Sequence, residues 1–136
     1  MYIMANEAII RELHGNPKGG VTRFDVGNSD AIEKGAILFL TDPKTISGAQ
    51  LNFQPCAGIA AEEKVASDGA LSIGVYQKGI FDCVCSEAVT AGALVSLSGA
   101  NTLRKATSAD ILSGAVLGKA LETASANEVI QVRVNL

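Results

Sequence analysis

The most reactive side chains in this sequence are three thiols, Cys56, Cys83 and Cys85. Residues 80–85 are predicted to form a strand, in which Cys83 and Cys85 point to the same face. Such a pair could bind a metal or form a redox couple, but structural zinc needs further ligands, and the only histidine, His14, is far away in the sequence. We interpret the two thiols as small buried hydrophobic side chains. The odd number of cysteines, without a signal peptide, favours reduced thiols in a cytosol.

No other motif predicts an enzyme. His14 lies in a segment rich in Gly and Pro, where a solvated side chain is the default interpretation, and the sequence does not support a Ser–His–Asp arrangement. Residues 114–119 have nearly the glycine spacing of a Walker phosphate loop, but Ala120 follows Lys119 where that loop needs Ser or Thr. We expect no catalytic residue and no cofactor-binding residue.

Four acidic side chains near predicted turns could bind a cation. Asp25, Asp30, Glu33 and Asp42 lie in separate turns and lack the spacing of a calcium-binding loop. We interpret them as solvated turn residues and expect no metal site.

The composition indicates a folded chain with a partner. Apolar residues make up 48% of the 136 residues and charged residues 18%, which excludes a highly charged disordered chain. No apolar run approaches the length of a membrane helix, and a net charge of −3 argues against a nucleic-acid partner. Aromatic residues are only 4%, so the core must be aliphatic. We expect the excess aliphatic surface to be buried between subunits of a homo-oligomer.

The first 20 residues are predicted to form an irregular N-terminal arm that reaches a neighbouring molecule. A short apolar patch at 8–13 is followed by a Gly- and Pro-containing segment at 14–20. A secretory signal is not predicted, because no basic region precedes an apolar stretch. Translation could start at Met1 or at Met4, and the sequence does not decide between them.

Residues 21–136 are predicted to form one β-rich domain, a small barrel or sandwich of short strands. The clearest local prediction is a hairpin over residues 71–85 with a tight turn at 77–79. Residues 44–54 are predicted to be a loop, and residues 108–112 a short turn that Gly114 ends. The other strands are predicted at 21–26, 36–40, 56–61, 118–122 and 129–134.

The second half of the domain resembles the first. Residues 88–97 repeat the pattern of residues 31–40 at a spacing of 57, and residues 118–122 resemble 58–62. Two such units, packed together, could close a small barrel or sandwich. An internal duplication and chance similarity between Ala- and Gly-rich strands are both compatible with this pattern.

Several segments, in their order along the chain, resemble the small head-decoration (cement) proteins of tailed bacteriophages. Their motifs are turn and strand patterns rather than catalytic signatures, and the likeness covers most of residues 5–134. The segments are 5–7 (Ala-Asn-Glu), 58–60, 62–69, 73–76, 79–82, 90–100 and 118–122.

The resemblance implies a β-rich protein, often a trimer, that binds the major capsid protein on the outer surface of the virion. Such proteins clamp neighbouring capsid subunits against the pressure of packaged DNA, and they are made in the bacterial cytoplasm. The resemblance transfers no catalytic residue, cofactor, metal or capsid contact, and it implies no nucleic-acid or membrane partner.

Two other functions remain open at this point. The same composition suits another virion part, such as a head fibre base, a head–tail joining subunit or a tail-tube subunit. A small β-barrel module that binds a ligand is the third hypothesis; it would need a pocket with converging polar groups.

Overall fold

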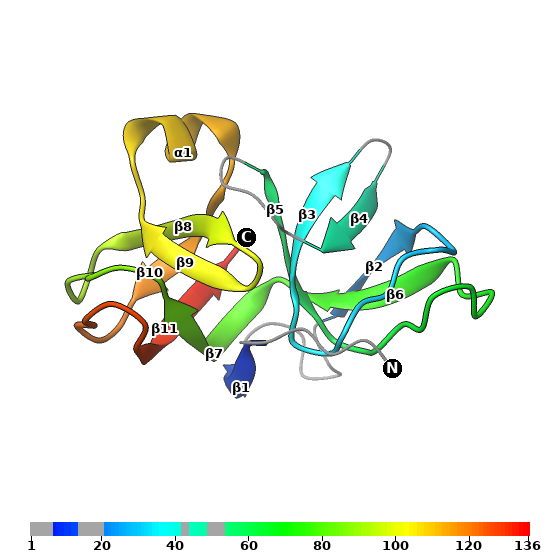
Figure 1. The fold of residues 1–136 in the computed structure, drawn as a ribbon, viewed down its shortest axis with the longest axis horizontal. Helices are drawn as coiled ribbons and strands as arrows, with labels where there is room; N and C mark the ends of the chain where they lie inside the picture. The colour runs from blue at the N-terminus through cyan, green and yellow to red at the C-terminus, as the bar shows by residue number, and fades with distance from the viewer. Residues whose placement is uncertain (1–6, 14–20, 42–43, 49–53) are drawn as a thin grey trace.

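Two five-stranded barrels lie side by side in the computed structural model, which describes residues 7–13, 21–41, 44–48 and 54–136 (Figure 1). The prediction of a mainly β chain that forms a small barrel is confirmed, with two barrels in place of one. The first closes in the order β2 (Val21–Val26), β4 (Thr45–Gly48), β3 (Ile37–Thr41), β5 (Cys56–Ala60) and β6 (Ser72–Tyr76). The second closes in the order β7 (Lys78–Cys85), β11 (Val129–Asn135), β10 (Val116–Ala120), β8 (Leu94–Gly99) and β9 (Thr102–Lys105).

Two further elements belong to the second barrel. Strand β1 (Ile9–Leu13) pairs antiparallel with β7, and helix α1 (Ser108–Ser113) connects β9 to β10. The side chain of Thr107 caps the start of α1, and Gly114 ends it with φ 76°. The first barrel carries no counterpart of α1 among its described residues.

The two barrels repeat one arrangement of strands. In each, the first strand along the chain pairs in parallel with the third, β2 with β4 and β7 with β9, whereas every other pairing is antiparallel. Equivalent details include one isolated bridge per barrel (Ile32–Lys64 and Val89–Ala124) and a glycine with φ 90° before the second strand (Gly35 and Gly92). The similarity at a spacing of 57 residues therefore corresponds to a repeat of the fold.

A glycine at the same place in each barrel lets two strands approach closely. A Cβ on Gly58 of β5 would collide with the carbonyl oxygen of Tyr76, and a Cβ on Gly118 of β10 would collide with that of Arg133. Both glycines lie beside a register shift in the pairing with β3 or β8. These positions accept no side chain without a shift of the backbone.

Strands β3 and β5 bury both of their faces. Alternate side chains enter the core of the first barrel, and those between them pack with the core of the second. The first set includes Leu38, Ala57 and Ala60, and the second includes Ile37, Cys56 and Ile59. The two barrels therefore share one apolar interface.

Hydrogen bonds reinforce this interface. The N–H of Ile37 donates to Oδ1 of Asn101, in the turn between β8 and β9, at 2.8 Å. Asn101 is fully buried and has φ 57°, a left-handed conformation that Asn tolerates. The N–H of Cys56 donates to the carbonyl of Gly114 at 2.9 Å. Asn101 thus satisfies a buried donor that the strands leave unpaired.

The predicted hairpin over residues 71–85 is wrong. Strand β6 pairs with β2 and β5 of the first barrel, whereas β7 pairs with strands of the second. Only Gln77 separates the two strands, which is too short for a reversal, so the chain passes from one barrel into the other (Figure 1). The alternating pattern is the same in a hairpin and in such a crossing, and only the pairing partner differs.

Other local predictions also need correction. Part of the predicted loop at 44–54 is strand β4, whose Ile46 is fully buried. The segment at 108–112 is a capped helix rather than a turn, and its cap is Thr107. Within the predicted arm, residues 9–13 form strand β1, because they complete an open edge of β7. Residues 1–6 and 14–20 lie outside the described residues, so the arm and the domain boundary at 20 stay predictions.

We predict that Asn101→Gly lowers the free energy of unfolding by about 1–3 kcal/mol, because it leaves the buried N–H of Ile37 without its acceptor. Glycine keeps the left-handed backbone, so the variant isolates the hydrogen bond. Lys44→Gly is the matched control: Lys44 lies at the equivalent turn, with φ 40° and an exposed side chain, and should change stability by less than about 0.5 kcal/mol. Urea unfolding measures both; equal effects would contradict the role of Asn101.

Candidate interaction surfaces

The three thiols lie in the core. Cys83 and Cys85 point into the second barrel, and Cys56 lies at the interface between the barrels. Burial raises the pKa of Cys56 and of Cys83 to about 12, and it also raises the pKa of Cys85. A thiol is a nucleophile and a metal ligand only as the thiolate, so these side chains act as small apolar groups.

Of the other candidate site residues named in the sequence, the structure describes Asp25, Asp30 and Glu33. His14 and Asp42 lie outside the described residues, and Asp25, Asp30 and Glu33 stay apart, as their sequence positions suggest. Within the described ranges, no three His, Cys, Asp or Glu side chains gather where they could hold a metal ion. Residues 114–119 form the end of α1 and the start of β10 rather than a phosphate loop.

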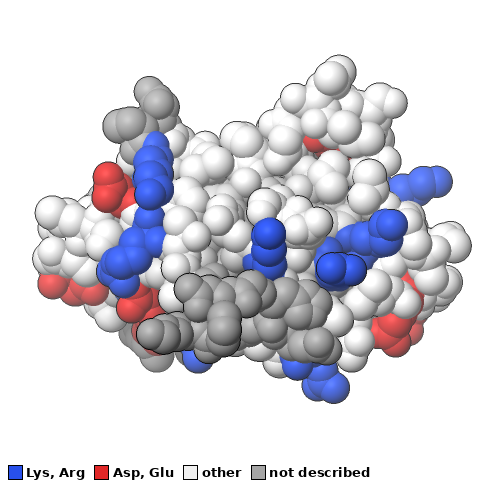
Figure 2. Space-filling view, turned by 180° about the vertical axis from the view of Figure 1, so that it is seen from behind, with Lys and Arg blue, Asp and Glu red and all other residues white. Residues whose placement is uncertain are grey.

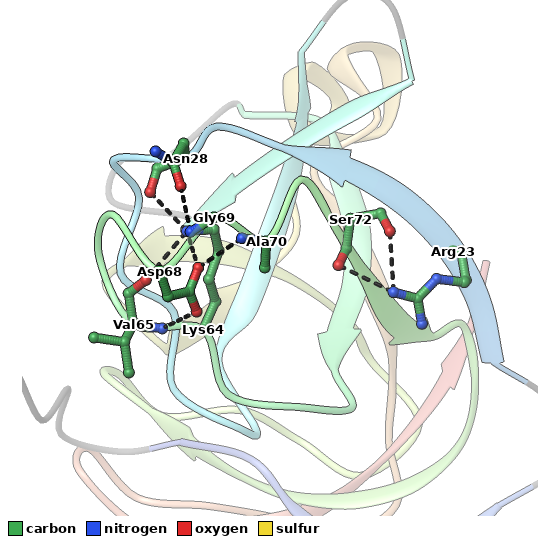
Figure 3. A network of polar contacts seen from close by, with 8 residues as sticks. All are labelled: Arg23, Asn28, Lys64, Val65, Asp68, Gly69, Ala70 and Ser72. Carbon is green, nitrogen blue, oxygen red and sulfur yellow. Dashed lines mark hydrogen bonds and ion pairs between the residues drawn. The ribbon is translucent and has the colours of Figure 1, made fainter.

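A buried lysine anchors the loop between β5 and β6. The ammonium of Lys64 donates to the carbonyls of Asn28 (2.7 Å) and Val65 (3.2 Å) and to Oδ1 of Asp68 (3.2 Å) (Figure 3). The carboxylate of Asp68 accepts the N–H groups of Val65 and Ala70. The Ala70 N–H is the largest cause that lowers the pKa of Asp68, and Lys64 adds to it against the effect of burial. Polar contacts therefore fix the shape of this loop.

The loop between β10 and β11 is fixed in an equivalent way. Glu128 accepts the N–H of Ser125, as Asp68 does for Val65. Glu122 accepts the N–H of Gln131 at 2.8 Å, and in the first barrel Glu62 accepts the N–H of Gly74 at 2.7 Å. We call these two segments, residues 61–71 and 121–128, the end loops, because they lie at opposite ends of the molecule (Figure 1).

Each end loop presents exposed aliphatic side chains. Val65 and Leu71 lie in the first, and Leu121 in the second; Val129, at the start of β11, follows it directly. Leu71 is 63% exposed and Val129 is 58% exposed. Apolar groups on a loop of fixed shape can bind a partner with little loss of conformational entropy.

Helix α1 presents a third apolar projection. Leu112 is 89% exposed, and Ile111 beside it is also exposed. The buried carboxylate of Asp110 fixes the start of the helix. It accepts hydrogen bonds from the guanidinium of Arg104 at 2.9 Å and from the N–H of Thr107 at 2.8 Å. Burial acts to raise the pKa of Asp110, but the hydrogen bonds from Thr107 and Arg104 outweigh it and lower the pKa.

Two pockets lie on the surface of the described residues. One pocket lies on β8, β10 and β11, and another lies between β1 and the first barrel. Neither lining contains a carboxylate, a thiol or an imidazole. On the face in Figure 2, Lys and Arg stand in separate groups, and Asp and Glu lie mainly toward the two sides. The helix that the structure describes is too short to cross a membrane.

The exposed aliphatic residues were not among the functional residues that the sequence predicted. Val129 could have been found, because Val129, Gln131 and Arg133 occupy every second position of one strand and therefore point to the same, outward face. Leu71 could not, since the same alternation groups it with the buried Ile73.

We predict that Asp110→Asn lowers the free energy of unfolding at pH 7 by about 1–3 kcal/mol. Because the folded protein lowers the pKa of Asp110, its contribution is complete above the ordinary value of about 4 and is lost as pH falls further. The difference between the wild-type chain and the variant should therefore shrink in acid. Asp25→Asn, at an exposed site, is the control; a pH-independent difference for Asp110→Asn would contradict the assignment.

We also predict that the native protein reacts slowly with a thiol reagent such as a mixed aromatic disulfide at pH 8, because the buried thiols stay protonated. Unfolding in guanidinium should release three reactive thiols per chain. Rapid reaction of the native chain at Cys83 or Cys85 would show that the described core opens easily.

Of the comparisons with known proteins, only the one with solved structures found a similar protein. No protein-family model matches the chain, and no curated protein matches its sequence. Among solved structures, the N base of the head fibre protein gp8.5 of bacteriophage phi29 is similar, with a TM-score of 0.54 over 85% of this chain and 92% of that one. The sequence identity is 13%, so the likeness establishes that the chain has the fold of this phage head fibre base.

Proposed function

We propose that this chain is a structural protein of a tailed-phage head that decorates the outer surface of the assembled capsid. The observation that carries the proposal is the fold likeness to a phage head fibre base, which covers 85% of this chain and 92% of that one. The ordered sequence resemblance to head-decoration proteins supports the same class independently. The two lines together favour a virion part over the small ligand-binding module.

The arrangement of the end loops suggests how such a protein acts. Two loops of similar construction project from opposite ends of one unit, and each carries exposed aliphatic residues beside it. A unit of this shape can contact two neighbouring capsid subunits at once. It then binds only where those subunits have the correct spacing, and it stabilises the expanded shell by mass action. Many copies on one shell make modest contacts collectively strong.

The oligomeric state belongs to the proposal as well. We propose a homo-oligomer, with a trimer as the expected form, on the major capsid protein lattice. Exposed aliphatic residues such as Leu112 on α1 leave apolar surface that subunit contacts would bury.

A head fibre base is the second candidate, and the comparison with phi29 favours it specifically. In that case the two barrels attach a longer projecting structure to the head. Both candidates place the chain on the outside of the capsid, and they differ in what extends beyond it.

We predict that purified protein binds expanded capsids that lack it and raises their melting temperature, while it binds unexpanded shells weakly. Binding is measured by co-sedimentation, and melting by light scattering or calorimetry. Leu71→Asp combined with Val129→Asp should weaken binding at least tenfold without loss of fold. Thr41→Asp combined with Asn135→Asp adds the same two charges at exposed sites outside the end loops and α1, and is the control.

Electron microscopy of the same particles separates the candidates. A decoration protein gives density over the whole shell, and a fibre base gives projections. A head–tail joining part gives density at one vertex only. Absence of binding to expanded capsids, or binding only at one vertex, would contradict the proposed function.

A further inference from the structure

In the second barrel, an added strand covers part of one edge of β7. One side of β7 pairs with β11 from Lys78 to Val84. The other side pairs in parallel with β9 at Val84 and Cys85 only. Strand β1 fills the rest of that side, with Ile9 opposite Asp82 and Ile10 opposite Phe81.

The first barrel has the same edge, and no strand of the described residues lies on it. One side of β2 pairs with β6 from Val21 to Asp25, and the other side pairs in parallel with β4 at Asp25 and Val26 only. The two barrels can be aligned so that β6, the partner of β2, corresponds to β11, the partner of β7. In this alignment, Val21–Arg23 of β2 correspond to part of the β7 segment that β1 covers. None of the described residues pairs with Val21–Arg23 on that side.

The peptide groups along this edge point outward. The N–H of Asp25 donates to the carbonyl of Lys44, on the β4 side, whereas the N–H of Val26 donates to Leu71, on the β6 side. Because successive residues alternate sides, Val21 and Arg23 direct their N–H and C=O groups to the same side as Asp25. The side chains of Val21 and Arg23 are both exposed. The edge is therefore accessible to a further strand.

We infer that the Val21–Arg23 edge of β2 accepts an added antiparallel strand from a partner protein, in the place where β1 adds to β7. This mode of recognition gains affinity from main-chain hydrogen bonds and specificity from the side chains beside them. The inference deepens the proposed function. It rests on that function in one respect, the identification of the partner as a virion protein.

Charge identifies the chemistry of the added strand. In the second barrel, Arg11 of β1 forms an ion pair with Asp82 of β7 at 3.7 Å. The residue equivalent to Asp82 is Arg23, so the charge at this place is reversed. Lys44 adds a second cation beside β2, with its ammonium 5.6 Å from the centre of the Phe24 ring.

A second copy of β1 is therefore a poor occupant, since its Arg11 would face Arg23. Arg23 is held by Glu62 at 3.3 Å and by Ser72 at 3.0 Å (Figure 3), yet its side chain is 61% exposed. The favoured occupant is an extended segment of another protein with a carboxylate where β1 has Arg11.

Two peptides test this inference without a capsid. The first has the sequence of residues 7–13, Glu-Ala-Ile-Ile-Arg-Glu-Leu, and the second carries Arg11→Glu. Each is added to isotopically labelled full-length protein, and amide chemical shifts are followed by NMR. We expect the Arg11→Glu peptide to shift the amides of Val21 and Arg23 and to bind about two- to fivefold more tightly than the native peptide.

Variants of the protein give the matched controls. Arg23→Glu should reverse the preference between the two peptides, whereas Lys119→Glu, on an outward position of β10, should leave it unchanged. Val21→Pro, at the first residue of β2, removes an outward N–H and should weaken the binding of both peptides. Thermal unfolding of each variant confirms that it is folded.

The inference is overturned if the Arg11→Glu peptide shifts neither amide, or if the wild-type protein and its Arg23→Glu variant show the same preference between the two peptides. Failure of the protein to bind capsids would contradict the proposed function and leave the peptide result unaffected. The two proposals can therefore fail separately.

Discussion

The structure depends on strands β3 and β5 burying both faces, one in each barrel. An ordinary barrel strand has one face in its core and one toward water. Here every residue of β5 is buried, and its sequence is accordingly small and apolar, Cys-Ala-Gly-Ile-Ala. Gly58 is essential within it, because any side chain would meet the backbone of β6. The aliphatic composition of the chain follows from this shared wall.

The shared wall explains how the two repeats of the fold form one unit. Separate barrels of this size would each have a small core, and the interface contributes Ile37 and Ile59 to a common one. Asn101 and the backbone around Gly114 then satisfy the polar groups that the close contact buries. The two end loops are thereby held at a fixed separation, as the proposed contact with two neighbouring capsid subunits requires.

The two barrels differ from each other outside the interface that β3 and β5 form. Among the described residues, only the second barrel carries a helix, α1, and the first barrel has a buried Lys64 where the second has Ala124. Strand β1 covers only one of two equivalent edges. Helix α1 and strand β1 lie at the surface, so the two similar barrels offer different contacts.

Much of the β content could be predicted from the sequence, because alternation within a strand is a local property. Strands at Val21–Val26 and Val129–Asn135 show it clearly. Pairing is not local, and the apparent hairpin at 71–85 failed for that reason. Strand β4 was missed because its residues Thr45–Gly48 are polar except for Ile46. The shared face of Cys83 and Cys85 followed from their spacing, whereas exposed Leu71 and the edge of β2 become visible only once the strands are paired.

The most direct test of the account is a cryo-electron microscopy reconstruction of expanded capsids to which the purified protein has been added. The account predicts density for both barrels as one body on the outer surface, with the two end loops on different capsid subunits. Density for the protein at a single vertex, inside the shell, or with only one end loop in contact would contradict it.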